Sequence, residues 1–312
     1  MNKDNKNLVY VAATLYAMIT GLSFLFTKIA LGAGSPIDIL AHRFTASFIA
    51  ILIPIAFRWV KLDYSKGRIK KIIPLALLYP MLFFGFQTFG LQYASSSEAG
   101  ILLAAAPVFT LILATYFLKE KTSALQKLSV ILSVLGVMYI LLMKGSALDI
   151  KNIRGIVLLL FSALCFAGYS VMARNLTKEF TGTELSYMMI TISFICFNLI
   201  AIGKHLINGT IREFFIPLGN MNFVIAVIYL GVLSSLVTSL LTNYVLSKIE
   251  ASKMSVFSNL GTVITIIAGV VFLNEEIFYY HIIGSILIVG GVIGTNMEQF
   301  KRNQKRQPTE GQ

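Results

Sequence analysis

Ten long apolar runs, separated by short gaps, constrain this chain more than any other feature of its sequence. A helix that crosses the hydrocarbon core of a bilayer needs about 20 mostly apolar residues. Runs of this kind cover residues 8–31, 37–57, 72–91, 98–118, 124–144, 154–174, 183–203, 223–246, 252–273 and 277–297. Only 13% of the 312 residues are charged, whereas soluble domains carry about a quarter. The sequence therefore predicts an all-α integral membrane protein with ten transmembrane helices.

The segments between the runs are too short to form a separate domain. The longest of them, 58–71 and 204–222, could not bury a core. Residues 299–312 are hydrophilic, and we expect them to form a disordered cytoplasmic tail. The first run of 24 residues exceeds the apolar stretch of about 7–15 residues in a signal peptide, so we predict a retained transmembrane helix there.

The distribution of lysine and arginine predicts the orientation of the chain in the membrane. With the N-terminus inside, 19 of the 26 basic residues fall on the inner side. Basic residues are enriched in cytoplasmic loops, so both termini are predicted to be cytoplasmic in a protein of the plasma membrane. The formal net charge of +12 then follows from topology, and it requires no nucleic acid or other acidic partner.

The two halves of the chain share a sequence pattern. Residues of the first two spans match residues 146 positions later, and residues of the next three match residues 155 positions later; the pairs include Lys28 with Arg174, Asp38 with Glu184, Leu91 with Leu246, and Gly136 with Gly291. Because five spans are an odd number, the second half must enter the membrane in the opposite orientation. We therefore predict two inverted five-helix repeats, 8–145 and 154–298. Inverted repeats are typical of alternating-access transporters, in which the substrate site lies near the midplane.

An ordered set of features resembles the EamA family of the drug/metabolite transporter superfamily. Besides the five-plus-five arrangement, the set comprises the basic residue that opens span 2 (Arg43), the small-residue stretch 93–99, Pro107, the Leu-x-Glu that ends spans 4 and 9 (Glu120, Glu275), and the glycines of spans 5 and 10. The resemblance covers about residues 8–298 and implies movement of small metabolites, often export of amino acids or related compounds. The position equivalent to Pro107 is Thr262, so span 9 is expected to be straighter than span 4.

Ionisable residues within membrane spans are costly and often functional. We hypothesise that those near the outer ends of the spans (Lys28, Arg43 and Glu98) and near the inner ends (Arg174 and Glu184) act as gates. The alternative is that each is an interfacial charge whose side chain extends to the membrane surface. His42 and Glu98 are the candidates for carrying a coupling proton.

An aromatic face on span 3 and a run of hydroxyls on span 8 predict a substrate pathway. The candidate residues are Tyr79, Phe83 and Gln87 on span 3, Ser234, Thr238 and Thr242 on span 8, and Asn259 on span 9. An aromatic wall facing a polar wall at the midplane would suit an amphipathic small molecule such as an amino acid. The alternatives are simple packing for the aromatic face, and hydrogen bonds within or between helices for the hydroxyls.

These patterns favour a secondary transporter that exports a small metabolite and uses no cofactor or resident metal. The sequence has no G-x-x-x-x-G-K-[ST] motif, which argues against ATP as the direct driver. A scaffold or receptor would have little loop surface for partners. An intramembrane enzyme would need a paired nucleophile and base, yet His42, His205 and His281 lie far apart in the sequence. A G-x-x-x-G motif at Gly290 and Gly294 indicates close helix contact, either within the chain or in a homodimer.

Overall fold

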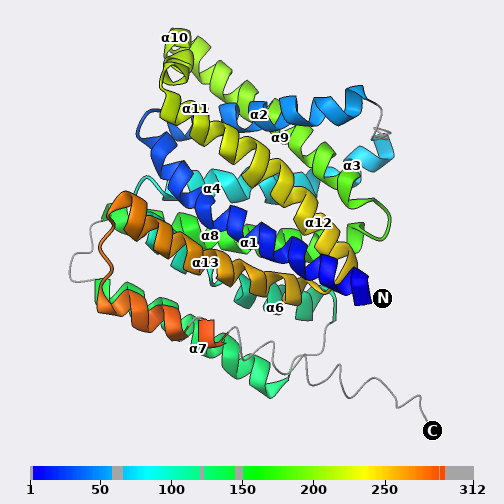
Figure 1. Ribbon diagram of the computed structural model, residues 1–312, viewed down its shortest axis with the longest axis vertical. Coiled ribbons are helices and arrows are strands. Elements are labelled where there is room, and N and C mark those ends of the chain that lie inside the picture. Colours follow the sequence, from blue (N-terminus) through cyan, green and yellow to red (C-terminus); the bar gives the residue numbers. More distant parts are fainter. Residues whose placement is uncertain (1–2, 58–65, 120–122, 145–149, 288, 292–312) are drawn as a thin grey trace.

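The computed structural model describes residues 3–57, 66–119, 123–144, 150–287 and 289–291 (Figure 1). Its helices, in chain order, are α1 (Lys3–Leu31), α2 (Pro36–Ala56), α3 (Lys66–Ala76), η1 (Leu77–Leu82), α4 (Phe83–Gly90), α5 (Ser96–Leu103), α6 (Ala106–Phe117), α7 (Ala124–Lys144), α8 (Ile150–Leu176), α9 (Gly182–Ile207), α10 (Ile211–Phe215), η3 (Ile216–Gly219), α11 (Met221–Ile228), η4 (Tyr229–Val237), α12 (Thr238–Lys248) and α13 (Ala251–Leu273). Residues 279–287 and 289–291 are also helical.

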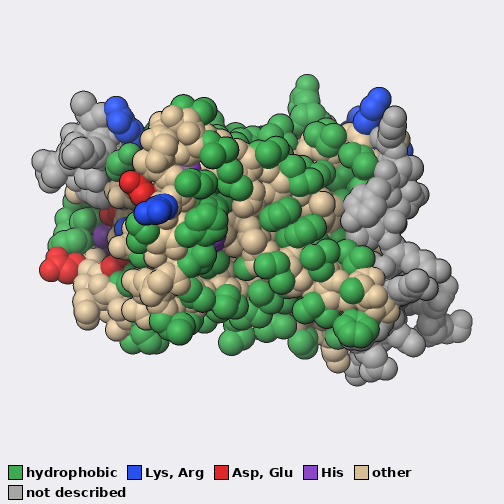
Figure 2. All heavy atoms as spheres, turned by 90° about the horizontal axis from the view of Figure 1, so that it is seen from above, with side chains coloured by type: hydrophobic (Ala, Val, Ile, Leu, Met, Phe, Trp, Pro, Cys, Tyr) green, Lys and Arg blue, Asp and Glu red, His purple; other side chains and the backbone are tan. Residues whose placement is uncertain are grey.

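The helices fall where the apolar runs predict them. Seven are long and apolar enough to cross a membrane: Asn7–Leu31, Pro36–Ala56, Gly67–Gly90, Ser96–Phe117, Ile153–Leu176, Gly182–Ile207 and Met221–Lys248. The other three predicted spans coincide with α7, α13 and the helical residues that begin at Tyr279. In Figure 2, hydrophobic side chains cover the middle of the molecule, and charged side chains gather toward its two ends. The chain is therefore an all-helical, multi-pass membrane protein.

Three of the spans are interrupted near their middle. The third is kinked between α3 and α4, within η1, where Pro80 lacks an N–H and Tyr79 leaves the helical region with φ −142° and ψ 123°. The eighth changes from α11 to the π-helical η4, and then to α12. The fourth ends as α5 and resumes as α6 next to Pro107, whereas α13 is continuous. This confirms that span 9 is straighter than span 4. Such π-helical segments frequently lie at functional sites.

The core of the bundle lies between helices from the two halves of the chain. α1 packs along α13, α6 and α4 pack on α8, and α2 packs on both α9 and η4. α1 and α13 approach closely at Gly21, where an added Cβ would lie 2.7 Å from the carbonyl oxygen of Gly261. α7 and the helix that begins at Tyr279 lie at the edge of the bundle (Figure 1). Nothing lies within 4 Å of a Cβ built at Gly290, and Gly294 is outside the described residues, so the homodimer stays a prediction.

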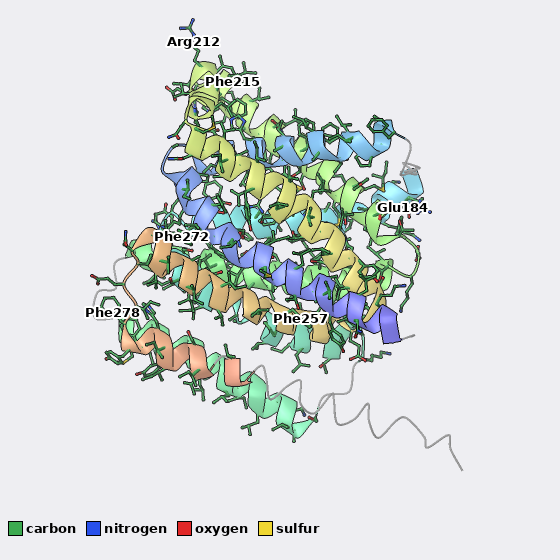
Figure 3. The ribbon with its side chains drawn as sticks, viewed as in Figure 1. Glu184, Arg212, Phe215, Phe257, Phe272 and Phe278 are labelled. Carbon is green, nitrogen blue, oxygen red and sulfur yellow. The ribbon has the colours of Figure 1, made fainter. Side chains whose placement is uncertain are left out.

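The bundle has two ends, which we name by one residue each. The Lys28 end holds the C-terminus of α1, and the Glu184 end holds the N-terminus of α9. Figure 3 shows Glu184 and Phe257 toward one end, and Arg212 and Phe272 toward the other. The predicted orientation places the Lys28 end outside the cell.

Candidate functional site

Arg43 lies on α2 and is completely buried, with 0% of its surface exposed. Its Nε donates a hydrogen bond to Ser235 Oγ at 2.7 Å, and its Nη2 donates to Ser234 Oγ at 2.9 Å. The guanidinium carbon lies 3.6 Å from the ring centre of Phe84, the geometry of a cation–π contact. The side chain therefore joins α2 to η4 on one side and to α4 on the other.

A glycine permits this close contact between α2 and η4. A Cβ added at Gly231 would lie 2.5 Å from the carbonyl oxygen of Arg43 and 2.7 Å from Cβ of Ala46. Ser47 donates a hydrogen bond to the carbonyl oxygen of Gly231 at 2.8 Å. The unusual backbone of η4 thus presents both a carbonyl and two serine hydroxyls to α2.

Five aromatic residues form a layer next to Arg43, which we call the aromatic layer: Tyr79, Phe83, Phe84, Phe166 and Tyr169. The rings of Tyr79 and Tyr169 stack with centroids 4.5 Å apart, and Phe83 lies 4.7 Å from Phe84 and 5.6 Å from Phe166. The hydroxyl of Tyr79 pairs with the side chain of Thr238, and Tyr79 also interacts electrostatically with Arg43. The aromatic and polar walls predicted from spans 3 and 8 are therefore in contact through this pair.

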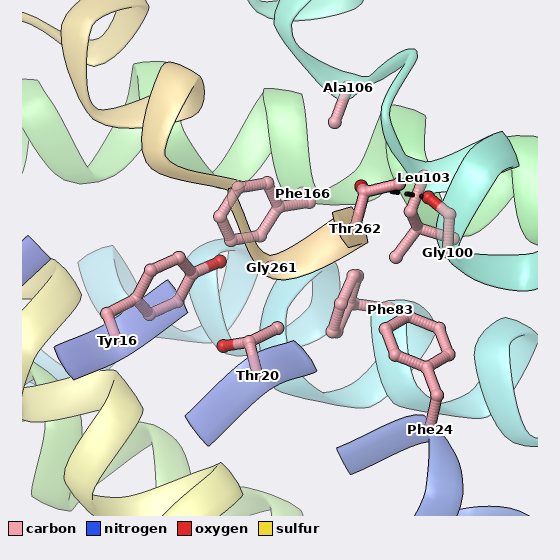
Figure 4. A pocket seen from close by; sticks show the side chains of 10 residues that line it. All are labelled: Tyr16, Thr20, Phe24, Phe83, Gly100, Leu103, Ala106, Phe166, Gly261 and Thr262. Carbon is pink, nitrogen blue, oxygen red and sulfur yellow. Dashed lines mark hydrogen bonds between the residues drawn. The ribbon is translucent and has the colours of Figure 1, made fainter. Parts of the chain in front are cut away.

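A small cavity borders the aromatic layer at Phe83 and Phe166 (Figure 4). It encloses about 30 Å³ and is lined by Tyr16, Thr20, Phe24, Phe83, Gly100, Leu103, Ala106, Phe166, Gly261 and Thr262. The Thr262 hydroxyl donates to the carbonyl oxygen of Gly100 at 3.1 Å, at the start of the break between α5 and α6. This volume suits about one water molecule.

A buried polar chain continues from the aromatic layer toward the Glu184 end. The Tyr169 hydroxyl donates to Asn243 Oδ1 at 2.7 Å, and Asn243 Nδ2 donates to Ser186 Oγ at 2.8 Å. These three residues come from α8, α12 and α9. The chain therefore ties together helices that pack around the central site.

At the Lys28 end, charged side chains join the loops of the two halves. Lys28 Nζ donates to the carbonyl oxygen of Leu91 at 2.9 Å. Glu275 Oε1 accepts from the backbone N–H of Ser96 at 2.6 Å, and its Oε2 accepts from the N–H and hydroxyl of Ser97 at 2.8 and 2.6 Å. Glu98 forms a capping box at the start of α5. Both carboxylates interact electrostatically with Lys28.

The Glu184 end has a related set of contacts. Arg174 Nη1 donates to the carbonyl oxygen of Leu246 at 2.7 Å, and Glu184 forms a capping box with Thr181 at the start of α9. Glu184 also pairs with Arg68 at 2.9 Å. Four of the five predicted gate residues thus lie at the two ends and contact a helix terminus: Lys28, Glu98, Arg174 and Glu184. The fifth, Arg43, is instead buried between α2, η4 and α4.

A second buried polar cluster lies between α2 and α9 at the Lys28 end. His205 Nε2 lies 3.0 Å from Asp38 Oδ1, and its Nδ1 forms a hydrogen bond with Thr210 Oγ1 at 2.8 Å. The other oxygen of Asp38 accepts from Ser35 Oγ at 2.7 Å. His42 stacks on Phe214, the ring that also contacts His205. Two histidines that are far apart in the sequence are therefore neighbours.

The comparison with known families decides the class of protein. A model of the EamA-like transporter family matches residues 7–142 and 153–297, which is most of the chain. The chain belongs to the EamA-like transporter family. It is accordingly a multi-pass membrane transporter, as its apolar helices also indicate.

Relatives of this EamA-like transporter occur in several kingdoms. It is 50% identical to the uncharacterized transporter YcxC of Bacillus subtilis over 98% of both chains. It is 27% identical to an uncharacterized transporter of Archaeoglobus fulgidus, with 91% of this chain and 96% of that one covered. The WAT1-related protein At5g07050 of Arabidopsis thaliana is 25% identical, over 90% of this chain and 78% of that one. A crystal structure of 17% identity shares the fold, with a TM-score of 0.63 over 96% of this chain and 99% of that one.

The structure of this EamA-like transporter brings most of the predicted pathway residues together. Tyr79, Ser234 and Thr238 meet around Arg43, which the sequence had suggested as a gate residue. Phe83 lies between the aromatic layer and the cavity. The side-chain polar atoms of Gln87 and Thr242 are buried and have no hydrogen-bond partner in the part of the chain that the structure describes. Asn259 lies in α13, and its side chain is outside the described part of the structure.

Three contacts of this EamA-like transporter were not predicted from its sequence. They are the bonds from Glu275 to α5, the pairing of Asp38 with His205, and the hydrogen bond between Arg43 and Ser235. The sequence did contain one signal for the first, because Glu275 ends span 9 in the repeated Leu-x-Glu. Its counterpart Glu120 lies outside the described residues.

Proposed function

We propose that this transporter exports a small amphipathic metabolite, an amino acid or a related compound, by alternating access between two inverted five-helix repeats, 8–145 and 154–298. In this mechanism the substrate site stays near the midplane while the two ends of the bundle open in turn. Both termini are cytoplasmic and the membrane is the plasma membrane. The direction of transport follows the family resemblance, and a proton is the candidate coupling ion.

The observation that carries the proposal is a pair of matching contacts at opposite ends of the bundle. Lys28 holds the carbonyl of Leu91, and Arg174 holds the carbonyl of Leu246. The offset of 146 residues relates the two basic residues, and the offset of 155 relates the two leucines. Two unrelated halves would have no reason to form the same contact at opposite ends. An inverted repeat predicts this arrangement.

The packing of the helices gives independent support. The contact of α1 with α13 has its counterpart in the contact of α8 with α6, and the contact of α2 with η4 has its counterpart in that of α9 with η1. Both departures from regular α-helix occupy the same place, because the kinked segment Leu77–Leu82 shifted by 155 residues falls within the π-helical segment Tyr229–Val237. The family model also matches the chain twice, once in each half.

Counterflow in proteoliposomes tests the proposal. Liposomes that contain the purified protein would be loaded with unlabelled amino acids, amines or nucleosides. Uptake of the labelled compound would then be followed with and without a pH gradient. We expect saturable exchange of one amphipathic class, and dependence on the pH gradient would indicate a coupling proton. Empty liposomes and the variant Arg212→Gln, at an exposed position on α10, are the controls.

Two variants probe the alternating mechanism. Lys28→Gln and Arg174→Gln each remove a charged hydrogen bond, whose contribution is about 1.5–3 kcal/mol. Each should favour opening of its own end by about 10-fold or more, so each should slow exchange. The two variants should make the centre of the bundle accessible to impermeant thiol reagents from opposite sides of the membrane. If both variants made the centre accessible from the same side of the membrane, the inverted arrangement would be contradicted. If no compound showed saturable exchange, transport of this class of compound would be contradicted.

A further inference from the structure

The positive charge of Arg43 is not neutralised by any residue that the structure describes. Its hydrogen-bond partners are the hydroxyls of Ser234 and Ser235 and, more weakly, a backbone carbonyl oxygen at 3.5 Å. The ion pairs found among the described residues do not include it. A charge in a membrane span usually has a partner or a functional role. The uncompensated positive charge of Arg43 therefore favours binding of an anion beside it.

One edge of the guanidinium also lacks a hydrogen-bond acceptor. The group has five N–H donors. Nε and Nη2 are bonded to the serines of η4, whereas Nη1 is buried and has no partner among the described residues. Buried donors are nearly always paired in folded proteins. Nη1 of Arg43 is thus available to donate to an acceptor that is not among the described residues.

The surroundings of Arg43 favour a carboxylate as that acceptor. A single guanidinium balances the single charge of a carboxylate, whereas a phosphate group carries about −1.5 to −2 and would leave excess negative charge in a low-dielectric site. The aromatic layer begins at Phe84, against which Arg43 lies, so an apolar or aromatic body could pack beside the carboxylate. The hydroxyls of Ser239 and Thr242, in α12, are buried and have no hydrogen-bond partner among the described residues, so they could bond the polar groups of such a molecule.

We propose that Nη1 of Arg43 binds the carboxylate of the transported compound, which is a monocarboxylate with an apolar or aromatic body. This inference rests on the proposed transport function, because Arg43 is reachable only when one end of the bundle opens. Ser234 and Ser235 fix the opposite edge of the guanidinium, so the free edge is oriented before the substrate arrives. In this assignment one edge of the guanidinium holds the side chain in place through the two serines, and the other edge binds the substrate.

Matched compounds that differ only in the carboxylate test this assignment. The probes are L-phenylalanine with L-phenylalaninamide, L-leucine with L-leucinamide, and 3-phenylpropionate with its amide. Binding to the purified full-length protein would be measured by titration calorimetry, and transport by counterflow. We expect the acids to bind at least about 30-fold more tightly than their amides, because the amides cannot neutralise Arg43.

Substitutions then connect the preference to the residue. Arg43→Gln keeps hydrogen bonds to the serines without the charge, and it should reduce the acid-to-amide ratio to within about twofold of one. Arg43→Lys keeps the charge without the forked donor geometry, and it should give an intermediate ratio. Arg212→Gln removes an exposed arginine from α10 and should leave the ratio unchanged.

The outcomes separate this inference from the proposed transport function. Saturable transport of amides or amines in preference to acids, or an acid-to-amide ratio that Arg43→Gln leaves unchanged, would overturn the inference and leave transport intact. Acid binding that depends on Arg43, without any counterflow, would support the inference and contradict transport. If neither arginine variant folds, the ratio in the unmodified protein decides, and equal binding of acid and amide overturns the proposal.

Discussion

The variant Glu275→Gln gives a direct test of the proposal that contacts at the Lys28 end close that end of the bundle. Glu275 follows α13 in the second half of the chain, and its carboxylate accepts three hydrogen bonds from Ser96 and Ser97 at the start of α5. The first turn of a helix has unpaired N–H groups and a positive partial charge, so a carboxylate there is stabilised in two ways. Gly269 leaves space for the contact, because a Cβ at that position would collide with Glu275 Oε2 and Ser97 Oγ.

The expected magnitude follows from these bonds. Glutamine keeps one acceptor oxygen, loses the second and replaces it with an NH₂ donor that would face an N–H or hydroxyl. A hydrogen bond to a charged group contributes about 1.5–3 kcal/mol, and a charge at a helix N-terminus contributes about 0.3–1 kcal/mol more. We take about 2 kcal/mol as the loss, which is about 30-fold in the equilibrium between closed and open Lys28 ends.

The assay reports which side of the membrane reaches the central cavity. Cys165→Ala and Cys196→Ala would first remove the native thiols. A single cysteine would then replace Thr262 in the cavity wall, and the rate of its reaction with an impermeant methanethiosulfonate would be measured from each side of the membrane. Glu275→Gln should raise the rate from the Lys28 side at least about 10-fold and lower it from the other side. Glu276→Gln, at the exposed neighbouring position, is the matched control. An unchanged rate, or an equal rise from both sides, would refute the role of Glu275 as a latch.

Two further variants probe the packing of α2. Asp38→Asn removes the buried carboxylate that bonds His205 Nε2 at 3.0 Å, and we expect a loss of about 1–3 kcal/mol, measured as a lower midpoint of thermal unfolding in detergent; an unchanged midpoint would show that the pair contributes little. Gly231→Ala would place a methyl group against the carbonyl of Arg43 and should cost about 1–3 kcal/mol. Gly85→Ala, where nothing lies within 4 Å, is its control, and equal midpoints for the two alanine variants would contradict the close approach.

The positions of the helices were predictable because they depend on local physics. A run of about 20 apolar residues has few alternatives to a membrane helix, and all ten predicted ranges are helical among the described residues. The break beside Pro107 and the continuity of α13 at Thr262 also followed from the residues themselves, since proline removes a helix hydrogen bond. The contact between Tyr79 and Thr238 followed from matching an aromatic face to a hydroxyl-rich one.

The contacts of Arg43 could not be predicted in the same way. Its serine partners lie 191 and 192 positions away in the chain, and which helix face meets which depends on helix rotation. That rotation changes at a π-helical turn, and η4 shows no clear signal in a sequence of Leu, Val and Ser. The pairing of Asp38 with His205 has the same difficulty, because the partners are 167 positions apart on two helices that pack side by side.

The places where the two halves differ are as informative as those where they agree. The contacts of Lys28 and Arg174 match at the two ends, as the proposed alternating-access mechanism requires, since it needs a closure at each end in turn. A central site is used in both states and needs no duplicate. The offset of 146 residues takes Arg43 to Met189, which is buried but carries no charge, and the offset of 155 takes Tyr79 to Ser234. The match between the two halves therefore includes these end contacts and is lost at Arg43 and Tyr79, the residues that lie at the proposed substrate site.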